Sequence, residues 1–234
     1  MALILSIETA TEVCSTALSL DGKTIALKEA HGSSEHSALL TLFIEAVTKE
    51  AGISLKDVDA IAVSKGPGSY TGLRIGVSVA KGLCYALEKP LISVSTLMAL
   101  ALSAQYDYQQ IMNEGILLCP MIDARRMEVF SALYNQELRE IKPADAVILD
   151  ENTFYEYSTS QIAIFGNGAA KCREIYALRS NILFPGSVFP SACSIGQLAY
   201  EKFKQADFEN TAYFEPFYLK DFIAGKPNVK GLRS

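Results

Sequence analysis

The chain has 234 residues, which is enough for one large domain or for two lobes of roughly 100 to 130 residues each. Half of the residues are apolar, so a substantial core can be buried, and the formal net charge is −5. Because phosphate neutralisation supplies most of the affinity of RNA-binding proteins, this acidic balance indicates that any role with RNA is indirect or shared.

The first half of the sequence predicts three strands, followed by helices that alternate with further strands. Asp21-Gly22 joins two strand-like runs, which is typical of a hairpin, and Gly52 stands where a glycine commonly ends a helix. A meander followed by this alternation gives a mixed sheet covered by helices, the order found in ribonuclease-H-like lobes. The predicted strands cover 3–8, 14–20, 24–30, 60–64 and 91–95, and the predicted helices cover 36–51, 71–87 and 96–104.

The second half follows a polar stretch at 105–115 and begins like the first. Residues 7–15 resemble residues 122–131, with one extra residue in the second copy, and each copy runs strand, acid, turn, Glu-Val, strand. Two readings are open: a coincidence between two short hairpins, or an internal duplication of one lobe. The remaining predicted elements are a strand at 161–165, a turn at 166–168, helices at 169–178 and 191–204, and an aromatic strand-like run at 215–219.

A glycine-rich loop lies between the strand at 60–64 and the helix at 71–87. Ser69 or Thr71 can cap that helix, and free N–H groups at its start can hold an anion. The loop lacks the Gly-Lys-Ser/Thr ending of a P-loop and is not G-x-G-x-x-G. We therefore favour a tight strand-to-helix turn, which lets the helix pack closely, over an anion site.

Glu8 and Asp123 each end the first strand of their half of the chain. In a two-lobed fold we expect the two acids to face each other across a cleft, where paired carboxylates can hold a hydrated magnesium ion. The alternative is that both are solvated acids at strand ends. The turn at 9–12 contains no glycine and adds the negative charge of Glu12, which disfavours a bound triphosphate.

The helices predicted at 36–51 and 71–87 are apolar over more than one stripe. In the first, Leu40, Phe43, Ile44 and Val47 form one face, and further apolar residues widen it; the second carries only two charged residues. A helix that covers one sheet face needs an apolar arc of only about 100°. Either both helices are deeply buried within this chain, or each packs on its own sheet and on a partner. We favour a partner interface.

The histidine and cysteine content argues against a zinc hydrolase and against disulfide bonds. The two histidines, His31 and His36, are five residues apart, which does not place them on one helical face and argues against a zinc hydrolase. The five cysteines are scattered, which indicates reduced thiols in a reducing compartment.

Residues 1–7 lack the basic region of a signal peptide, and no uncharged apolar run approaches the roughly 18 residues that span a bilayer. We expect a soluble, cytoplasmic protein without a membrane role.

The sequence resembles the TsaB (YeaZ-type) family of subunits of the bacterial tRNA threonylcarbamoyladenosine machinery. The most specific match is the run Gly-Pro-Gly-Ser-Tyr-Thr-Gly-Leu-Arg-Ile-Gly at 66–76. Weaker matches follow in the right order along almost the whole chain, at 7–11, 14–15, 35–36, 94–97, 122–125, 128–129, 166–168 and 215–219.

The resemblance implies an α/β fold of the actin-like (ASKHA) type, a duplication of two ribonuclease-H-like lobes with mixed sheets flanked by helices. We expect the first lobe, carrying the dimerisation helices, at 1–104 and the second at 105–234, with the C-terminal helix a candidate to pack back towards the first. The resemblance also implies a pseudo-enzyme without a cofactor or metal. Proteins of the related TsaD type carry a pair of metal-binding histidines on their early helix, where this chain has only His36.

The partners implied are a TsaD-type subunit, which transfers a threonylcarbamoyl group to the adenosine beside the anticodon, a TsaE-type ATPase, and a second copy of the chain. tRNA is expected to be contacted only indirectly. The partner contacts are expected at His36, Leu39, Leu40, Phe43, Val47, Tyr70, Leu73, Arg74 and Val77. A vestigial nucleotide cleft is expected at Glu8, Thr9, Thr11, Asp123, Gly166 and Gly168.

Two enzyme alternatives stay open on the sequence. The first is an actin-like small-molecule kinase or ATPase that uses Glu8 and Asp123 around magnesium–ATP. The second is a self-sufficient metallohydrolase, which the histidine count disfavours.

Overall fold

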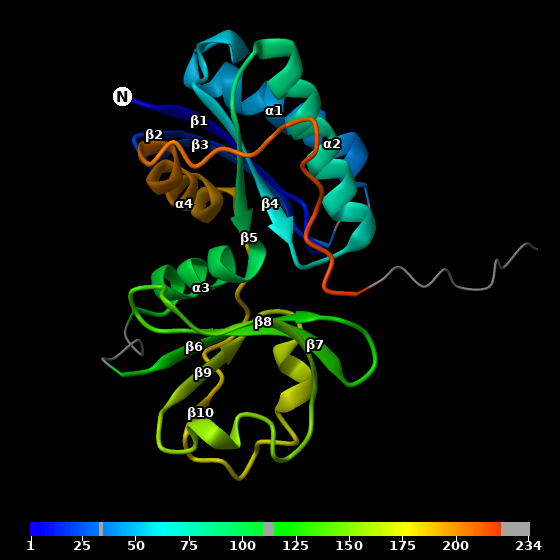
Figure 1. The fold of residues 1–234 in the computed structure, drawn as a ribbon, viewed down its shortest axis with the longest axis vertical. Coiled ribbons are helices and arrows are strands. Elements are labelled where there is room, and N and C mark those ends of the chain that lie inside the picture. Colours follow the sequence, from blue (N-terminus) through cyan, green and yellow to red (C-terminus); the bar gives the residue numbers. More distant parts are fainter. Residues whose placement is uncertain (33–34, 110–114, 221–234) are drawn as a thin grey trace, which may run out of the picture.

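The structure is a computed structural model that describes residues 1–32, 35–109 and 115–220. Two five-stranded sheets form two lobes that follow one another along the longest axis of the molecule (Figure 1). Within the described residues, we find no helix whose length and apolar character would let it cross a membrane. The five cysteines are free thiols and four of them are buried; burial raises the pKa of the Cys119 thiol to about 12.

The first sheet has the strand order β3-β2-β1-β4-β5. β1 pairs antiparallel with β2, and β2 with β3, whereas β4 and β5 run parallel to β1. Leu5 and Ile7 of β1 point to the face that α1 and α2 cover, and Ile4 points to the opposite face, because side chains alternate along a strand. The elements are β1 (Leu3–Glu8), β2 (Cys14–Leu20), β3 (Lys23–Ala30), α1 (His36–Ala51), η1 (Leu55–Asp57), β4 (Ala60–Gly66), α2 (Tyr70–Leu87) and β5 (Leu91–Ser95).

The second sheet repeats this plan with the order β10-β9-β6-β7-β8. β6, β7 and β8 form the antiparallel meander, and β9 and β10 add in parallel. The acid-turn-Glu-Val similarity between the two halves therefore lies at equivalent hairpins, β1–β2 and β6–β7. The elements are α3 (Thr96–Asp107), β6 (Leu117–Asp123), β7 (Glu128–Tyr134), β8 (Glu140–Ile148), η3 (Tyr155–Tyr157), β9 (Ile162–Phe165), η4 (Ala169–Cys172), β10 (Ile182–Leu183) and α4 (Ala192–Lys204).

The lobes exchange their last helices. α3 follows the first sheet in sequence, yet its Leu97 and Leu100 pack into the core of the second sheet with Leu118. α4 follows the second sheet, yet its Ile195 packs on the first sheet with Ile4. A lobe boundary at residue 104 therefore falls inside a helix that belongs to the second core.

Several predicted elements have the expected bounds, including β1, β2, α1 and β5. The helix predicted at 169–178 is wrong: only the 3-10 turn η4 forms, because no side chain caps its start and most of its hydrogen bonds span three residues. The strand predicted at 215–219 is also wrong: this segment pairs with no strand among the described residues, and the Phe217 N–H donates a single backbone hydrogen bond to the Lys65 carbonyl.

Candidate functional site

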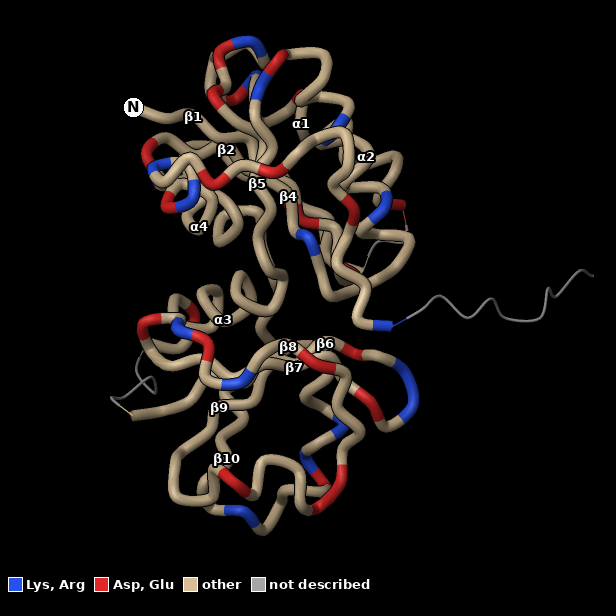
Figure 2. Tube along the Cα trace, in the orientation of Figure 1, with Lys and Arg blue, Asp and Glu red and all other residues tan. Residues whose placement is uncertain are grey.

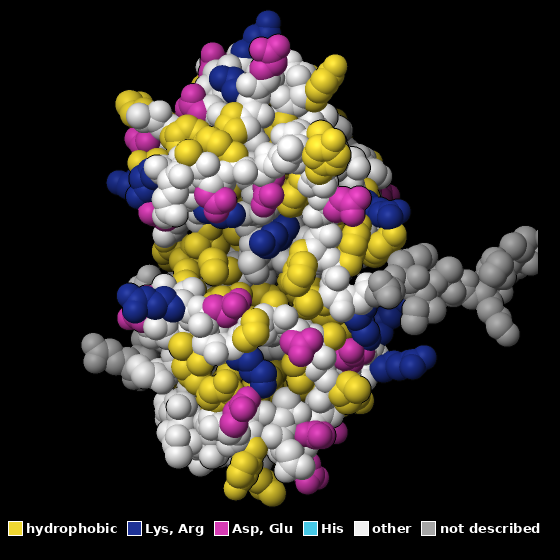
Figure 3. Space-filling view, in the orientation of Figure 1, with side chains coloured by type: hydrophobic (Ala, Val, Ile, Leu, Met, Phe, Trp, Pro, Cys, Tyr) yellow, Lys and Arg dark blue, Asp and Glu magenta, His cyan; other side chains and the backbone are white. Residues whose placement is uncertain are grey.

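A cleft of about 960 Å³ lies between the two lobes. The first lobe lines it with the β1–β2 turn and the glycine-rich loop before α2, and the second lobe with the β6–β7 turn and Asn167. Residues 217–220 close one side. Apolar side chains line the waist of the molecule between the lobes (Figure 3), and charged residues of both signs are interspersed on both lobes (Figure 2).

Glu8 does not reach this cleft. Its side chain is fully buried, and its Oε1 accepts hydrogen bonds from the Ala10 N–H at 2.6 Å and the Ser64 hydroxyl at 3.0 Å, while Oε2 has no partner among the described residues. Burial raises the pKa of this carboxyl to about 7, against the lowering effect of those hydrogen bonds. The expectation that Glu8 and Asp123 face each other across the cleft is therefore wrong.

The glycine-rich loop covers the β1–β2 turn directly. The Ser69 N–H donates to the Ala10 carbonyl at 2.7 Å, and the Thr9 hydroxyl donates to the Gly72 carbonyl at 2.8 Å. A Cβ atom on Gly72 would lie 2.1 Å from the Thr9 carbonyl oxygen, and one on Gly68 would lie 2.4 Å from that of Ala10. Only glycine permits this backbone contact, which supports the interpretation of the loop as a tight packing turn.

On the second lobe, Asp123 is exposed at the cleft but already paired. Its Oδ1 accepts from the Arg125 N–H at 2.6 Å and from Lys171 Nζ at 2.7 Å. Asn167 links the lobes: its Oδ1 accepts from the Asp123 N–H at 2.9 Å, and its Nδ2 donates to Glu12 at 2.6 Å. The carboxylates of Asp123 and Glu12 are therefore both hydrogen-bonded to groups of this chain.

The residues predicted for a nucleotide cleft therefore divide into two groups. Thr11 and Asp123 line the cleft. Glu8 and Thr9 are fully buried beneath it, and the glycines at 166 and 168 support the second turn from behind, where a Cβ on Gly166 would lie 2.3 Å from the Met121 carbonyl oxygen. Sequence reasoning missed Asn167 and Glu12 as the pair that joins the lobes, because their partnership depends on the tertiary fold.

The predicted partner residues also divide. Leu40, Val47 and Leu73 are buried in the core of the first lobe, as is Val77. His36 is buried too, and its Nε2 donates to the Thr11 carbonyl at 2.9 Å. These five side chains pack inside the chain, so their assignment as direct partner contacts needs correction.

The solvent side of α1 and α2 nevertheless carries apolar residues at helical spacing. Leu42, one of the further apolar residues that widen the predicted apolar arc of α1, is 58% exposed. Predicted contacts Leu39 and Phe43 are half-buried at the edge of the core. We call this surface the helix-pair face; it consists of Leu39, Leu42, Phe43, Ala46, Ile75, Val79 and Leu83.

Tyr70 and Arg74 occupy the start of α2, beside the cleft. The Arg74 guanidinium carbon lies 4.2 Å from the centroid of the Tyr70 ring, a distance typical of a cation–π contact. Both residues also contact Tyr218. As contacts to a second molecule they stay predictions.

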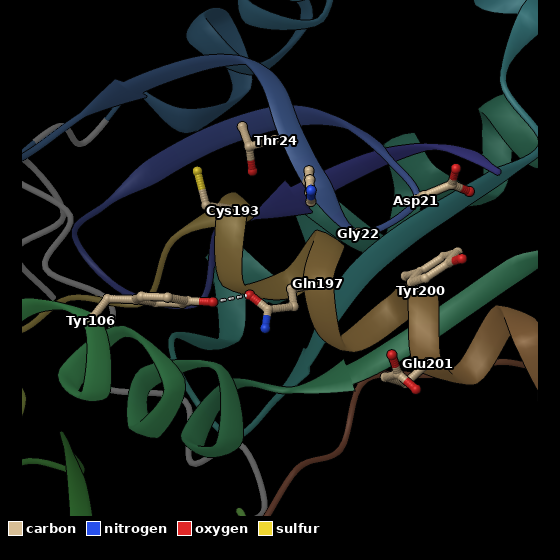
Figure 4. A pocket seen from close by; sticks show the side chains of 9 residues that line it. Asp21, Gly22, Thr24, Tyr106, Cys193, Gln197, Tyr200 and Glu201 are labelled. Carbon is tan, nitrogen blue, oxygen red and sulfur yellow. Dashed lines mark hydrogen bonds between the residues drawn. The ribbon is translucent and has the colours of Figure 1, made fainter. Parts of the chain in front are cut away.

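A second cavity of about 560 Å³ lies beside the β2–β3 turn, between α3 and α4 (Figure 4). Tyr106 of α3 donates its hydroxyl proton to the Gln197 side chain of α4, and Cys193 lies one turn away on the same helix. This hydrogen bond joins helices that belong to different lobes, so the cavity lies at the seam between them.

Known proteins that are similar to this chain in sequence identify its family. A family model described as "TsaD: tRNA N6-adenosine threonylcarbamoyltransferase" matches residues 29–226. The chain is 32% identical to the tRNA threonylcarbamoyladenosine biosynthesis protein TsaB of Escherichia coli (strain K12), over 95% of this chain and 96% of that protein.

Solved structures give the same result. A crystal structure from Pseudomonas aeruginosa, described as an uncharacterized protein with similarity to peptidase YEAZ, matches with a TM-score of 0.77 and 29% identity over 94% of this chain and 100% of that one. The activator of the 2-hydroxyisocaproyl-CoA dehydratase from Clostridium difficile with bound ADPNP matches in fold alone, with a TM-score of 0.50 and 9% identity over 88% of this chain and 97% of that one. The duplicated actin-like fold is thus confirmed, and the chain belongs to the TsaB (YeaZ-type) family of tRNA threonylcarbamoyladenosine biosynthesis proteins.

Proposed function

We propose that the chain is a non-catalytic subunit that binds a TsaD-type threonylcarbamoyltransferase and supports it in forming threonylcarbamoyladenosine beside the anticodon of tRNA. The observation that carries this proposal is the helix-pair face. The outer sides of α1 and α2 present apolar residues that their own sheet leaves partly uncovered.

The pattern on both helices favours a partner made of helices. Leu39, Leu42, Phe43 and Ala46 follow the spacing of one stripe on α1, separate from the buried residues that face the sheet. On α2, Gly82 is exposed, and a Cβ atom there would meet nothing within 4 Å. A glycine in a helix interior costs about 0.5–1 kcal/mol relative to alanine, and close approach of a second backbone would explain its use here.

The cleft supports a role without chemistry of its own. Glu8 is sealed under the glycine-rich loop, and the Ala10 N–H that a phosphate could use is bound to it. Asp123 is neutralised by Lys171. The kinase or ATPase alternative requires both acids around one ion, and this arrangement does not favour it. Calorimetry with magnesium and ATP tests it: tight binding by the chain alone would restore that alternative.

The other partners belong to the same proposal. A second copy of the chain can occupy the helix-pair face when the TsaD-type subunit is absent, because like faces of a homodimer are self-complementary. A TsaE-type ATPase is expected to join the complex, and tRNA to be contacted through the TsaD-type subunit. The acidic net charge of −5 supports this indirect role.

Replacement of an exposed apolar residue on the face tests the proposal. Leu42→Asp is expected to raise the dissociation constant for a TsaD-type protein at least tenfold, about 1.4 kcal/mol, because a charge would be buried without a partner. Ile148→Asp is the matched control, since Ile148 is 73% exposed on β8 in the other lobe. Affinity is measured by calorimetry and the assembly by light scattering. Equal affinities for both variants would remove the helix-pair face from the interface.

A further inference from the structure

The chain continues beyond α4 as a segment that we call the C-terminal strap, residues 207–220. It contains no helix and no strand apart from one isolated bridge to Leu91. The strap crosses the edge of β5, runs along α2 and ends at the gap between the lobes (Figure 1, orange to red).

The first part of the strap is fixed to the first lobe. The Glu209 N–H donates to the Leu91 carbonyl at 2.8 Å, at the free edge of β5. Lys81 of α2 donates to two strap carbonyls, those of Ala212 at 3.1 Å and Phe214 at 3.0 Å. Phe214 packs against the core of this lobe. The strap therefore has a defined path over α2.

Its path into the cleft depends on a glycine. The Phe217 N–H donates to the Lys65 carbonyl at 2.7 Å. A Cβ atom on Gly66 would lie 2.7 Å from the Phe217 carbonyl oxygen, and Gly66 has a φ of +112°, which other residues rarely adopt. The missing side chain of Gly66 therefore lets the strap backbone pack directly against the end of β4.

The last residues of the strap contact both lobes. Tyr218 stacks on Tyr70 of α2, with 4.9 Å between ring centroids, and its hydroxyl accepts from Arg74 Nε at 3.3 Å. Leu219 packs against the core of the second lobe, and Lys220 forms an ion pair with Glu128 of β7. One short segment therefore joins the start of α2 to the second sheet.

The lobes are joined differently at the α3–α4 seam. There the buried hydroxyls of Ser103 and Ser194 are 2.8 Å apart, and Tyr106 is hydrogen-bonded to Gln197. In Figure 1 this seam lies on the left of the gap, and the strap ends on the right. A packed helix crossing on one side, and on the other a short segment beside the Asn167–Glu12 hydrogen bond, is the geometry of a hinge and a catch.

We propose that the strap is a latch: residues 217–220 hold the second lobe against the first across the cleft, and their release opens the cleft about the α3–α4 seam. The contacts at the strap end are an aromatic stack, one hydrogen bond and a partly exposed ion pair, which are individually modest and so reversible. Tyr218 of the latch contacts Tyr70 and Arg74. Release of the latch therefore also changes the contacts at the start of α2.

Distance measurements on the full chain test the latch. Spin labels are placed on cysteines introduced at Ser37 of α1 and Glu151 of the second lobe, both exposed, in a Cys193→Ser background in which the other native cysteines are buried. The closed molecule is expected to give one narrow distribution. Tyr218→Ala combined with Lys220→Ala is expected to shift and broaden it towards longer distances.

Tyr213→Ala is the matched control, because Tyr213 lies in the same strap, is 84% exposed and forms hydrogen bonds to Asn210 within the strap. It is expected to leave the distribution unchanged. Lys220→Glu is expected to open the lobes by repulsion from Glu128, and adding Glu128→Lys is expected to restore the narrow distribution. A distribution equal to that of the wild type in both opening variants would overturn the latch, as would opening of equal size in the control.

Discussion

Glu8 shows how the surroundings of one side chain decide its role. The sequence predicts an acid at the end of β1, and the structure confirms that position. What the sequence does not contain is the fold of the glycine-rich loop onto the β1–β2 turn, which removes this carboxyl from water. Asp123 has the equivalent place in the second lobe but stays exposed, where it pairs with Lys171. Equivalent positions in sequence therefore carry different chemistry.

Replacement of Glu8 by glutamine is expected to change the pH dependence of stability. Burial raises the pKa of Glu8 in the folded state to about 7, above the ordinary glutamate value of 4.5, so the folded state binds the proton more tightly than the unfolded state. The contribution of Glu8 to the free energy of unfolding is fully present below about pH 4.5, where the carboxyl is protonated in both states. It is lost as the pH rises through about 7, a change of roughly 3 kcal/mol.

Urea denaturation of wild type and Glu8→Gln between pH 4.5 and 8 provides the measurement. The wild type is expected to lose roughly 3 kcal/mol more than the variant over this range, since only it must ionise a buried carboxyl. Parallel profiles for the two proteins would show that Glu8 does not titrate in this environment.

At the scale of elements, periodicity predicts where helices lie better than which side faces the sheet. The bounds of α1 agree with the prediction, because its apolar spacing and Gly52 mark both ends. Its two apolar stripes, one with Leu40 and Val47 and one with Leu39 and Leu42, are equally apolar in sequence. Only the register of the helix on β2 and β3 decides which stripe is core, so the predicted contacts mixed both.

Alanine substitutions on the two stripes are expected to separate core from surface. Leu40→Ala removes a side chain that is fully buried and is expected to lower the free energy of unfolding by about 2–5 kcal/mol. Leu42→Ala, on the exposed stripe, is expected to change it by less than about 0.5 kcal/mol. Urea titration at low protein concentration, where self-association is weak, measures both. Similar losses for the two variants would contradict the orientation of α1.

For the whole molecule, the duplication was readable in the sequence but the exchange of helices was not. The similar hairpins at 7–15 and 122–131 indicated two related lobes. α3 is buried on almost all sides, and α4 has one short buried stripe. Neither apolar pattern predicts which of the two sheets the helix covers. That choice depends on how the lobes pack together, which no local spacing records.

The exchange predicts that a change in α4 weakens strands far away in sequence. Ile195→Ala is expected to lower stability by about 2–5 kcal/mol and to reduce hydrogen-exchange protection in β4 and β5, because Ile195 packs on that side of the first sheet. Glu201→Ala, an exposed change on the same helix, serves as the control and is expected to leave protection intact. Loss of protection confined to the second lobe would contradict the packing of α4.

The helix exchange also has a consequence for synthesis on the ribosome. Roughly 100 residues separate the end of β5 from the start of α4. At a synthesis rate of about 5 to 20 residues per second, α4 is made roughly 5 to 20 s after β5, the last strand of the first sheet. Until then, the side of this sheet that α4 covers stays uncovered. During that interval the nascent chain presents the apolar surface around Ile4 and Ile92 to whatever binds emerging polypeptides, and the amino-terminal lobe is completed last.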